Sequence, residues 1–344
     1  AGNVKYVFET EAECREVVRT FLRKVMTEAP GVTISQAAVE LGDDFTQAVN
    51  ELEGKLRSQR NRPGMSVTTG RLGLKRSPQT GLPITSVDNN EHLDASTCAK
   101  RKRNNTPCLC QKSFGKAVKL QAGTSIPFEI SKMTGKNDWI AIVHADGNGL
   151  GQVVQKIGHQ IDDFKRFSHA LDRATIAAAN DAFRKISPEG GWKGTIPVRP
   201  IVLGGDDMTA IIRGDLAIEY VAEFMRQFEK NTGEGELRRI LEKAGMDRLT
   251  ACAGVAFTKS AYPFYYGYTL AEQLCTRAKK RAKENNAATA PSCLMFHKVQ
   301  DSFIMNYDEI EKRELTTAEG NSFCYGPYFL NKGQEPAAHY SIDE

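Results

Sequence analysis

Two apolar segments that each end in glycine and aspartate constrain the fold of this chain more than any other feature. Residues 139–147 read WIAIVHADG, and residues 197–207 read PVRPIVLGGDD. Apolar runs of this length, bounded by glycines, are typical of strands buried in a sheet. Because MTAIIR follows the second turn, residues 197–203 and 208–213 are predicted to pair as a hairpin.

The segments around these strands have the periodicity of helices. Apolar residues recur every three or four positions over 151–186, after Gly214 and Asp215, and over 267–285, which predicts amphipathic helices there. Two more buried strands are expected at 249–257 and 292–297. The resulting order, βααββαβαβ, predicts an α/β (α+β) fold in which helices pack on one mixed sheet.

The rest of the chain has weaker patterns. Residues 4–8 and 32–40 are interpreted as strands, and 10–28 and 43–58 as helices, which gives an N-terminal βαβα half. Residues 59–127 are rich in polar residues, glycine and proline and are interpreted as an irregular connector, apart from a short strand near 124–128. We therefore divide the chain into an N-terminal βαβα segment at 1–60, a basic, cysteine-containing connector at 61–130, a main domain with the regular βααββαβαβ order at 131–300 and a C-terminal extension at 301–344.

The composition is that of a globular protein. Hydrophobic residues make up 40% of the 344 positions and charged residues 26%, which argues against a disordered or fibrous chain. The net charge of +4 is too small to require a nucleic acid or an anionic membrane as partner. No uninterrupted apolar stretch approaches membrane-spanning length, and eight irregularly spaced cysteines fit reduced thiols. We expect a soluble, cytoplasmic protein.

Asp146, Asp206 and Asp207 follow strands that are predicted to be neighbours in the sheet. Three carboxylates brought together would raise one another's pKa values unless a cation were present. Mg²⁺ or Mn²⁺ is the expected ligand, because hard divalent ions take oxygen donors and keep sites for substrate phosphates. Two such ions could activate a ribose hydroxyl and stabilise a pyrophosphate leaving group, which is nucleotidyl transfer.

The residues around these aspartates are suited to a nucleoside triphosphate. A glycine-rich turn that opens a helix brings backbone N–H groups to phosphates, and paired glycines leave the backbone open to a sugar and base. A lysine of the last helix supplies a cation. The predicted nucleotide-binding residues are Gly147, Asn148, Gly149, Leu150, Gly151, Gly204, Gly205 and Lys279.

A simpler interpretation applies to each turn alone, because glycine and aspartate are common in turns for conformational reasons. The occurrence of both turns, each after an apolar strand, favours a single metal site. Gly42, Asp43 and Asp44 form the comparable N-terminal motif, which we interpret as a loop and helix cap.

The segment from Trp139 to His297 resembles the palm, or cyclase, domain of the large subunit of type III CRISPR effector complexes. The motifs that carry the resemblance are IVHADGNGLG, PIVLGGDDMTAI, AGVAFTKSAYPFYYGYTLAEQLCTRAKK and SCLMFHKVQDSF, with GPYFL later. More distantly, it resembles GGDEF diguanylate cyclases and polymerase palms. The resemblance implies a ferredoxin-like palm that converts ATP to cyclic oligoadenylates in antiviral defence. It also implies an N-terminal half related to a second, inactive palm.

Carried over by position, the resemblance implies that Asp146, the carbonyl of Gly147, Asp206 and Asp207 bind two metal ions and that Lys279 binds the triphosphate. It suggests RNA or CRISPR effector subunits as partners of a shortened or stand-alone relative, and leaves the oligomeric state, including a homo-oligomer, open. The family usually has a second acid where this chain has Asn148.

The connector leaves two interpretations open. The family often carries a zinc module, for which this chain offers Cys98, Cys108 and Cys110, with His92 as a conceivable fourth ligand; loop cysteines are the alternative. The basic residues 100–103, with Lys112 and Lys116 nearby, could contact RNA or phosphates, or could simply be solvated.

We therefore expect a metal-dependent nucleotidyltransferase that joins nucleoside triphosphates, with ATP favoured, into cyclic or short linear products. One alternative is a cyclic dinucleotide synthase of the GGDEF kind. Two features argue against it: Met208 stands where that family usually has an aromatic residue, and no RxxD motif precedes Gly204. The other rival is a palm without activity that serves as a scaffold in an RNA-guided complex.

Overall fold

The computed structural model describes residues 4–62, 73–103, 108–115, 123–127, 129–134, 138–157, 160–285, 290–300, 306–331 and 341–342. The chain divides into two compact units, Ala1–Thr106 and Pro107–Glu344. No helix within these residues is both long and apolar enough to cross a membrane.

The first unit contains three helices and a hairpin in its described residues: α1 (Glu11–Glu28), α2 (Phe45–Arg60), β1 (Ile84–Asp88), β2 (Glu91–Asp94) and α3 (Ala95–Arg103). Asp44 caps α2, because its carboxylate accepts hydrogen bonds from the N–H groups of Thr46 and Gln47 at 2.8 and 3.1 Å. The interpretation of this aspartate as a helix cap is confirmed.

The strands expected at 4–8 and 32–40 are absent from the structure. The N-terminal half is therefore not a βαβα unit in its described residues. Val4 and Tyr6 are 89% and 74% exposed, so the apolar residues that suggested a strand do not lie in a sheet. A strand needs a neighbour to satisfy its backbone polar groups, and neither segment has one.

The connector is more ordered than expected. The β1–β2 hairpin and α3 lie within it, and α4 (Cys108–Phe114) belongs to the second unit. The short strand expected near 124–128 is reduced to a single bridge between Ser125 and Thr195, while Phe128 lies outside the described residues.

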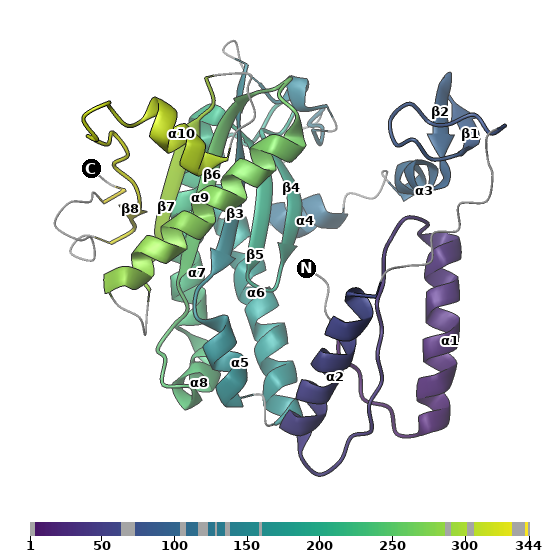
Figure 1. Cartoon of the computed structure of the whole chain (residues 1–344). Helices are drawn as coiled ribbons and strands as arrows, with labels where there is room; N and C mark the ends of the chain where they lie inside the picture. Colours follow the sequence, from purple (N-terminus) through teal and green to yellow (C-terminus); the bar gives the residue numbers. More distant parts are fainter. Residues whose placement is uncertain are drawn as a thin grey trace. The chain divides into compact units, whose positions relative to one another are not determined.

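The second unit is built on a six-stranded mixed sheet with the order β4-β5-β3-β6-β7-β8 (Figure 1). Its strands are β3 (Trp139–Gly147), β4 (Val198–Gly204), β5 (Asp207–Arg213), β6 (Ala251–Lys259), β7 (Cys293–Lys298) and β8 (Tyr328–Phe329). Its helices are α4, α5 (Leu150–Ile157), α6 (Ile161–Ile186), α7 (Ala217–Thr232), α8 (Gly235–Lys243), α9 (Phe264–Asn285) and α10 (Tyr307–Glu314), with short 3₁₀ turns at Ile130–Lys132 and Gly214–Leu216.

The order β4-β5-β3-β6, in which each neighbouring pair is antiparallel, is that of a ferredoxin-like sheet with two split βαβ units. Strand β7 extends the sheet in parallel beside β6. The predicted order βααββαβαβ is confirmed, apart from the additional helix α8.

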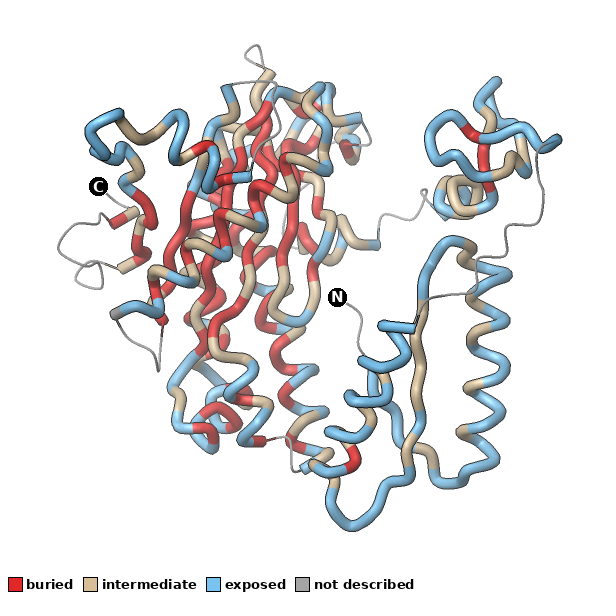
Figure 2. The backbone as a smooth tube through the Cα atoms, viewed as in Figure 1, coloured by how far each residue is buried: buried red, intermediate tan, exposed pale blue. Residues whose placement is uncertain are grey.

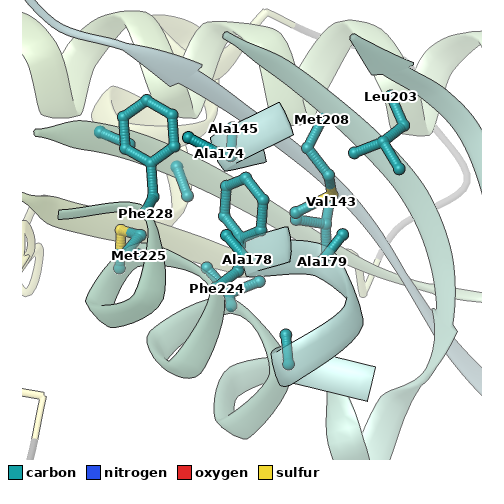
Figure 3. Close-up of a cluster of buried hydrophobic side chains, with 14 of the residues drawn as sticks. Val143, Ala145, Ala174, Ala178, Ala179, Leu203, Met208, Phe224, Met225 and Phe228 are labelled. Atoms are coloured by element: carbon teal, nitrogen blue, oxygen red, sulfur yellow. The ribbon is translucent and has the colours of Figure 1, made fainter. Parts of the chain in front are cut away.

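Helices cover both faces of the sheet because alternate side chains of β3 point to opposite sides. Ala141, Val143 and Ala145 pack with residues of α6 and α7, whereas Ile140 and Ile142 pack with residues of α9. Figure 3 shows Val143 and Ala145 against Phe224 and Phe228 of α7. Buried residues are concentrated in this unit (Figure 2), so the core holds the end of β3 in a fixed position.

Candidate active site

The three predicted acidic residues meet at one edge of the sheet. Asp146 lies near the end of β3, Asp206 lies in the turn between β4 and β5, and Asp207 is the first residue of β5. Strands β3 and β5 pair directly, with Ala145 opposite Met208, so the turn lies beside the end of β3. Each carboxylate has an oxygen within 4.8 Å of the others.

The carboxylates repel one another in this arrangement. Burial, a hydrogen bond with Asp146 and the charges of the other two aspartates raise the pKa of Asp206 to about 7, from an ordinary 3.8. The pKa of Asp207 is also raised, first by burial and then by Asp146, although His144 partly offsets this. Carboxylates that resist ionisation together are stabilised by a cation between them.

Lys279 of α9 places an ammonium group in this acidic cluster. Its Nζ forms an ion pair with Asp146 and donates to the carbonyl of Gly147 at 2.8 Å. A positive charge is therefore accommodated where a carboxylate and a carbonyl oxygen converge, and both are ligands that Mg²⁺ and Mn²⁺ prefer. The residues present thus fit a divalent ion, while contact of Lys279 with a triphosphate stays a prediction.

Gly147 permits the close approach of the two acidic turns. A Cβ atom at this position would lie 2.9 Å from Cβ of Asp206 and 2.8 Å from Cδ1 of Leu150. Real Cβ contacts are longer than this, so a side chain would push the turns apart. The glycine is needed for packing as well as for access to its carbonyl.

Asn148, predicted to bind nucleotide, anchors the loop to β6. Its side chain is 4% exposed, and its amide donates to Thr250 Oγ1 at 3.0 Å and to Cys252 Sγ at 3.3 Å. Its backbone N–H donates to the carbonyl of Thr250 at 2.8 Å. The side chain is thus directed into the protein, which explains why an acid is not required here for the loop to keep its shape.

The remaining residues of the loop lead into α5. Gly149 has a φ of +81°, which favours glycine. Leu150 begins α5 and packs on the core, and a Cβ on Gly151 would meet no atom within 4 Å. Their predicted contact with phosphates stays a prediction.

Helix α6 contacts the second acidic turn and holds it through a hydrogen bond. Gly205 has a φ of +63°, and its carbonyl accepts a hydrogen bond from the buried hydroxyl of Thr175. Gly204 lies beside Asp172 of the same helix. Neither α6 residue was among the predicted site residues. The available signal was a polar residue, Thr175, among the alanines of an otherwise apolar helix stripe.

The zinc interpretation gains no geometric support. The acidic cluster is the metal-compatible group found among the described residues. Cys98 and His92 belong to the first unit, and Cys108 and Cys110 to the second. His92 Nε2 lies 2.8 Å from Nζ of Lys75.

Comparison with known proteins agrees with this architecture. Residues 139–289 match the family model described as Cas10/Cmr2, second palm domain. This segment is similar to the second palm domain of Cas10/Cmr2. It contains all three aspartates and Lys279, and its strands β3 to β6 form the ferredoxin-like part of the sheet. The match agrees with the resemblance to a palm domain that the motifs predicted.

Solved structures with similar folds are distant in sequence. The Csm1–Csm4 cassette in complex with cA3 is 15% identical, with a TM-score of 0.30, over 42% of this chain and 19% of that chain. Csm1 in T. onnurineus is 13% identical, with a TM-score of 0.37, over 80% and 43%. The GGDEF domain of DgcB from Caulobacter crescentus in complex with c-di-GMP is 15% identical, with a TM-score of 0.29, over 51% and 97%.

The chain therefore spans about a fifth of the Csm1–Csm4 chain that it matches. No curated protein matches the sequence. The family-model match and the sheet topology both support a palm fold for residues 139–289.

Proposed function

We propose that this palm domain is a metal-dependent nucleotidyltransferase that joins nucleoside triphosphates, with ATP favoured, into cyclic or short oligonucleotide second messengers. The observation that carries the proposal is the cluster of three carboxylate oxygens within 4.8 Å. The ammonium of Lys279 is held between Asp146 and the Gly147 carbonyl in the same cluster.

Asp146, Asp206, Asp207 and the carbonyl of Gly147 would hold the divalent ions, Mg²⁺ or Mn²⁺, as a two-metal site. Bound ions of this kind lower the pKa of a coordinated hydroxyl and neutralise charge that develops on a leaving pyrophosphate. The protein supplies a fixed arrangement of negative oxygens, which the core below β3 and the Thr175 hydrogen bond hold in position.

The protein's own residues would also bind the substrate. The turn from Gly147 to Gly151 precedes α5, and the N–H groups at such a helix start attract phosphate. Once a divalent ion neutralises the aspartates, the ammonium group of Lys279 would leave the carboxylates and pair with the phosphates. Gly204 and Gly205 leave the backbone of the second turn accessible to a ribose.

The relationship to Cas10/Cmr2 supports a role in prokaryotic antiviral defence, with RNA or CRISPR effector subunits controlling the activity. The GGDEF-like rival and the scaffold rival both remain outcomes of the test. Nothing in the geometry of the three aspartates favours a scaffold, because an acidic cluster of raised pKa opposes folding when it has no ligand.

The test is direct. Purified protein is incubated with each labelled nucleoside triphosphate and Mg²⁺ or Mn²⁺, with and without candidate activating RNA, and products are identified by mass spectrometry. We expect adenylate oligomers and pyrophosphate, and a loss of several orders of magnitude in the Asp206→Ala, Asp207→Ala double variant.

A matched control is the Asp162→Ala, Asp181→Ala double variant, which removes two aspartates of α6 away from the turn and should keep activity. A product built only from guanosine would favour the GGDEF-like rival. Absence of pyrophosphate release under every activating condition, with a folded protein, would favour the scaffold.

A further inference from the structure

A row of aromatic rings crosses three neighbouring strands, β6, β7 and β8, at one side of the sheet. The ring centroids of Phe257 and Phe296 are 6.1 Å apart, and those of Phe296 and Tyr328 are 5.3 Å apart with nearly parallel rings. Phe257 and Tyr328 pack against the core on the side of α6 and α7. Phe296 pairs with Val255 of that same face but is 43% exposed, so part of its ring is open to solvent.

Two lysines continue this face along the same strands. Lys259 and Lys298 come two positions after Phe257 and Phe296, so the alternation of a strand puts them on the same side of the sheet. Both are exposed, and their ammonium groups lie 4.3 and 4.5 Å from the ring centroid of Trp139, at the start of β3. Within the described part of the chain, Lys298 pairs with no carboxylate. Two positive charges at one indole ring repel each other, which favours an anion beside them.

The combination of aromatic rings and ammonium groups indicates the kind of partner that this face fits. One exposed phenylalanine alone is ordinary on a protein surface, and the core of a protein–protein interface is usually depleted of lysine. A single nucleic acid strand matches both parts of the face, because its bases stack on aromatic rings and its phosphates pair with cations. Aromatic rings on a sheet surface are a common platform for two or three unpaired bases. A duplex would match only the lysines, because its bases are already stacked.

We propose that this face, called here the aromatic face, binds single-stranded nucleic acid without sequence preference. Its residues are Trp139, Phe257, Phe296, Tyr328, Lys259 and Lys298. The exposed ring of Phe296 is the stacking surface for a base, and the two lysines contact the flanking phosphates. Asp146 pairs with Lys279 of α9, which packs on the other side of the sheet. Binding to the aromatic face therefore does not depend on the proposed nucleotidyl transfer.

The test is fluorescence anisotropy with short labelled single strands of RNA and of DNA, and with a duplex, in EDTA so that no divalent ion bridges a strand to the aspartates. We expect both single strands to bind more tightly than the duplex. Phe296→Ala should weaken the binding of single strands by at least about fivefold, the lower end of the loss for one base–aromatic contact. Phe296→Trp should retain binding and Phe296→Leu should lose it, because leucine keeps an apolar side chain but offers no ring.

Lys298→Ala should change the salt dependence of binding. The slope of log Kd against log salt concentration should fall by about 0.7 for one lost phosphate contact of a single strand, whereas Phe296→Ala should leave this slope unchanged. The matched controls lie on α9, on the other side of the sheet. Tyr265→Ala removes a ring that is 69% exposed, and Lys280→Ala removes an exposed lysine. Both variants should bind like the wild type.

Three results would overturn the proposal. The first is no binding of either single strand by folded protein at low salt. The second is equal binding by the wild type, Phe296→Ala and Lys298→Ala. The third is self-association of the wild type, measured by light scattering, that Phe296→Ala abolishes while no strand binds, since the face would then join two copies of the chain. The assay uses neither a triphosphate nor a divalent ion, so its failure and the failure of the proposed nucleotidyl transfer can be told apart.

Discussion

Replacing Asp206 by asparagine should stabilise the metal-free protein while abolishing its activity. Burial and the neighbouring aspartates raise the pKa of Asp206 from 3.8 to about 7. Between these two values the native state keeps a proton that the unfolded chain has released, so the free energy of unfolding falls as the pH rises from about 4 to about 7. Asparagine has the same shape, cannot ionise and can still donate to Asp146.

The expected gain follows from that interval. A difference of about three pH units, at ~1.4 kcal/mol for each unit, gives at most about 4 kcal/mol at pH 8. For a unit of this size, 1 kcal/mol shifts the Tm by about 2–4 °C, so Asp206→Asn should raise the Tm by several degrees and at most by roughly 16 °C. The gain should be smaller at pH 5, where the native Asp206 is already protonated.

The assay is thermal unfolding in EDTA at pH 5, 6, 7 and 8, followed by circular dichroism. Asp215→Asn is the matched control, because Arg213 holds the pKa of Asp215 below its usual value through two hydrogen bonds of 2.6 and 2.9 Å. That variant should not be stabilised at any of these pH values. A Tm of Asp206→Asn below that of the wild type at pH 8, or a gain that does not change between pH 5 and pH 8, would refute the reasoning.

Three further substitutions test the site and its support. Lys279→Ala should reduce nucleotidyl transfer by about 10²- to 10³-fold, whereas the exposed neighbour Lys280→Ala should not, as measured by pyrophosphate release. Gly147→Ala should abolish Mn²⁺ binding measured by calorimetry, because its Cβ would lie 2.9 Å from Asp206 Cβ; Gly151→Ala, whose Cβ would meet nothing within 4 Å, should bind Mn²⁺ normally. Gly254→Ala should lower the Tm by more than 5 °C, because its Cβ would lie 1.9 Å from the Ala271 carbonyl oxygen; an unchanged Tm would contradict the tight packing of β6 on α9.

The palm-like half of the fold could be predicted because its signals are local and strong. Strand β3 is a continuous apolar run that is buried on both faces, and the β4–β5 hairpin is marked by its glycine pair. Helix α8 was missed, because it has only three buried residues, Leu237, Ile240 and Leu241, within a polar stretch.

The N-terminal half could not be predicted as well, because short alternating segments fit a strand only when a partner is available. Residues 4–8 and 32–40 have that alternation but no partner strand. The two helices predicted in this half are present, because a cap such as Asp44 acts within one helical turn and needs no distant contact.

The sequence identified the acidic residues of the site, but not the residues that hold the acidic turns in position. The meeting of Asp146 with Asp206 and Asp207 followed from the strand order. The support that Thr175 gives to the second turn depends on how α6 packs against the hairpin, and this arrangement has no signature in the spacing of residues.

Because Lys279 already pairs with Asp146, a divalent ion that binds at this site would replace the lysine ammonium group. The ammonium already compensates one of the three negative charges of the aspartates, so an incoming divalent ion adds only one net positive charge to the cluster if the lysine leaves. Occupancy should therefore depend less steeply on ionic strength than three bare carboxylates would predict. The displaced side chain of Lys279 would stay close to the site and could form an ion pair with an anionic ligand that binds next.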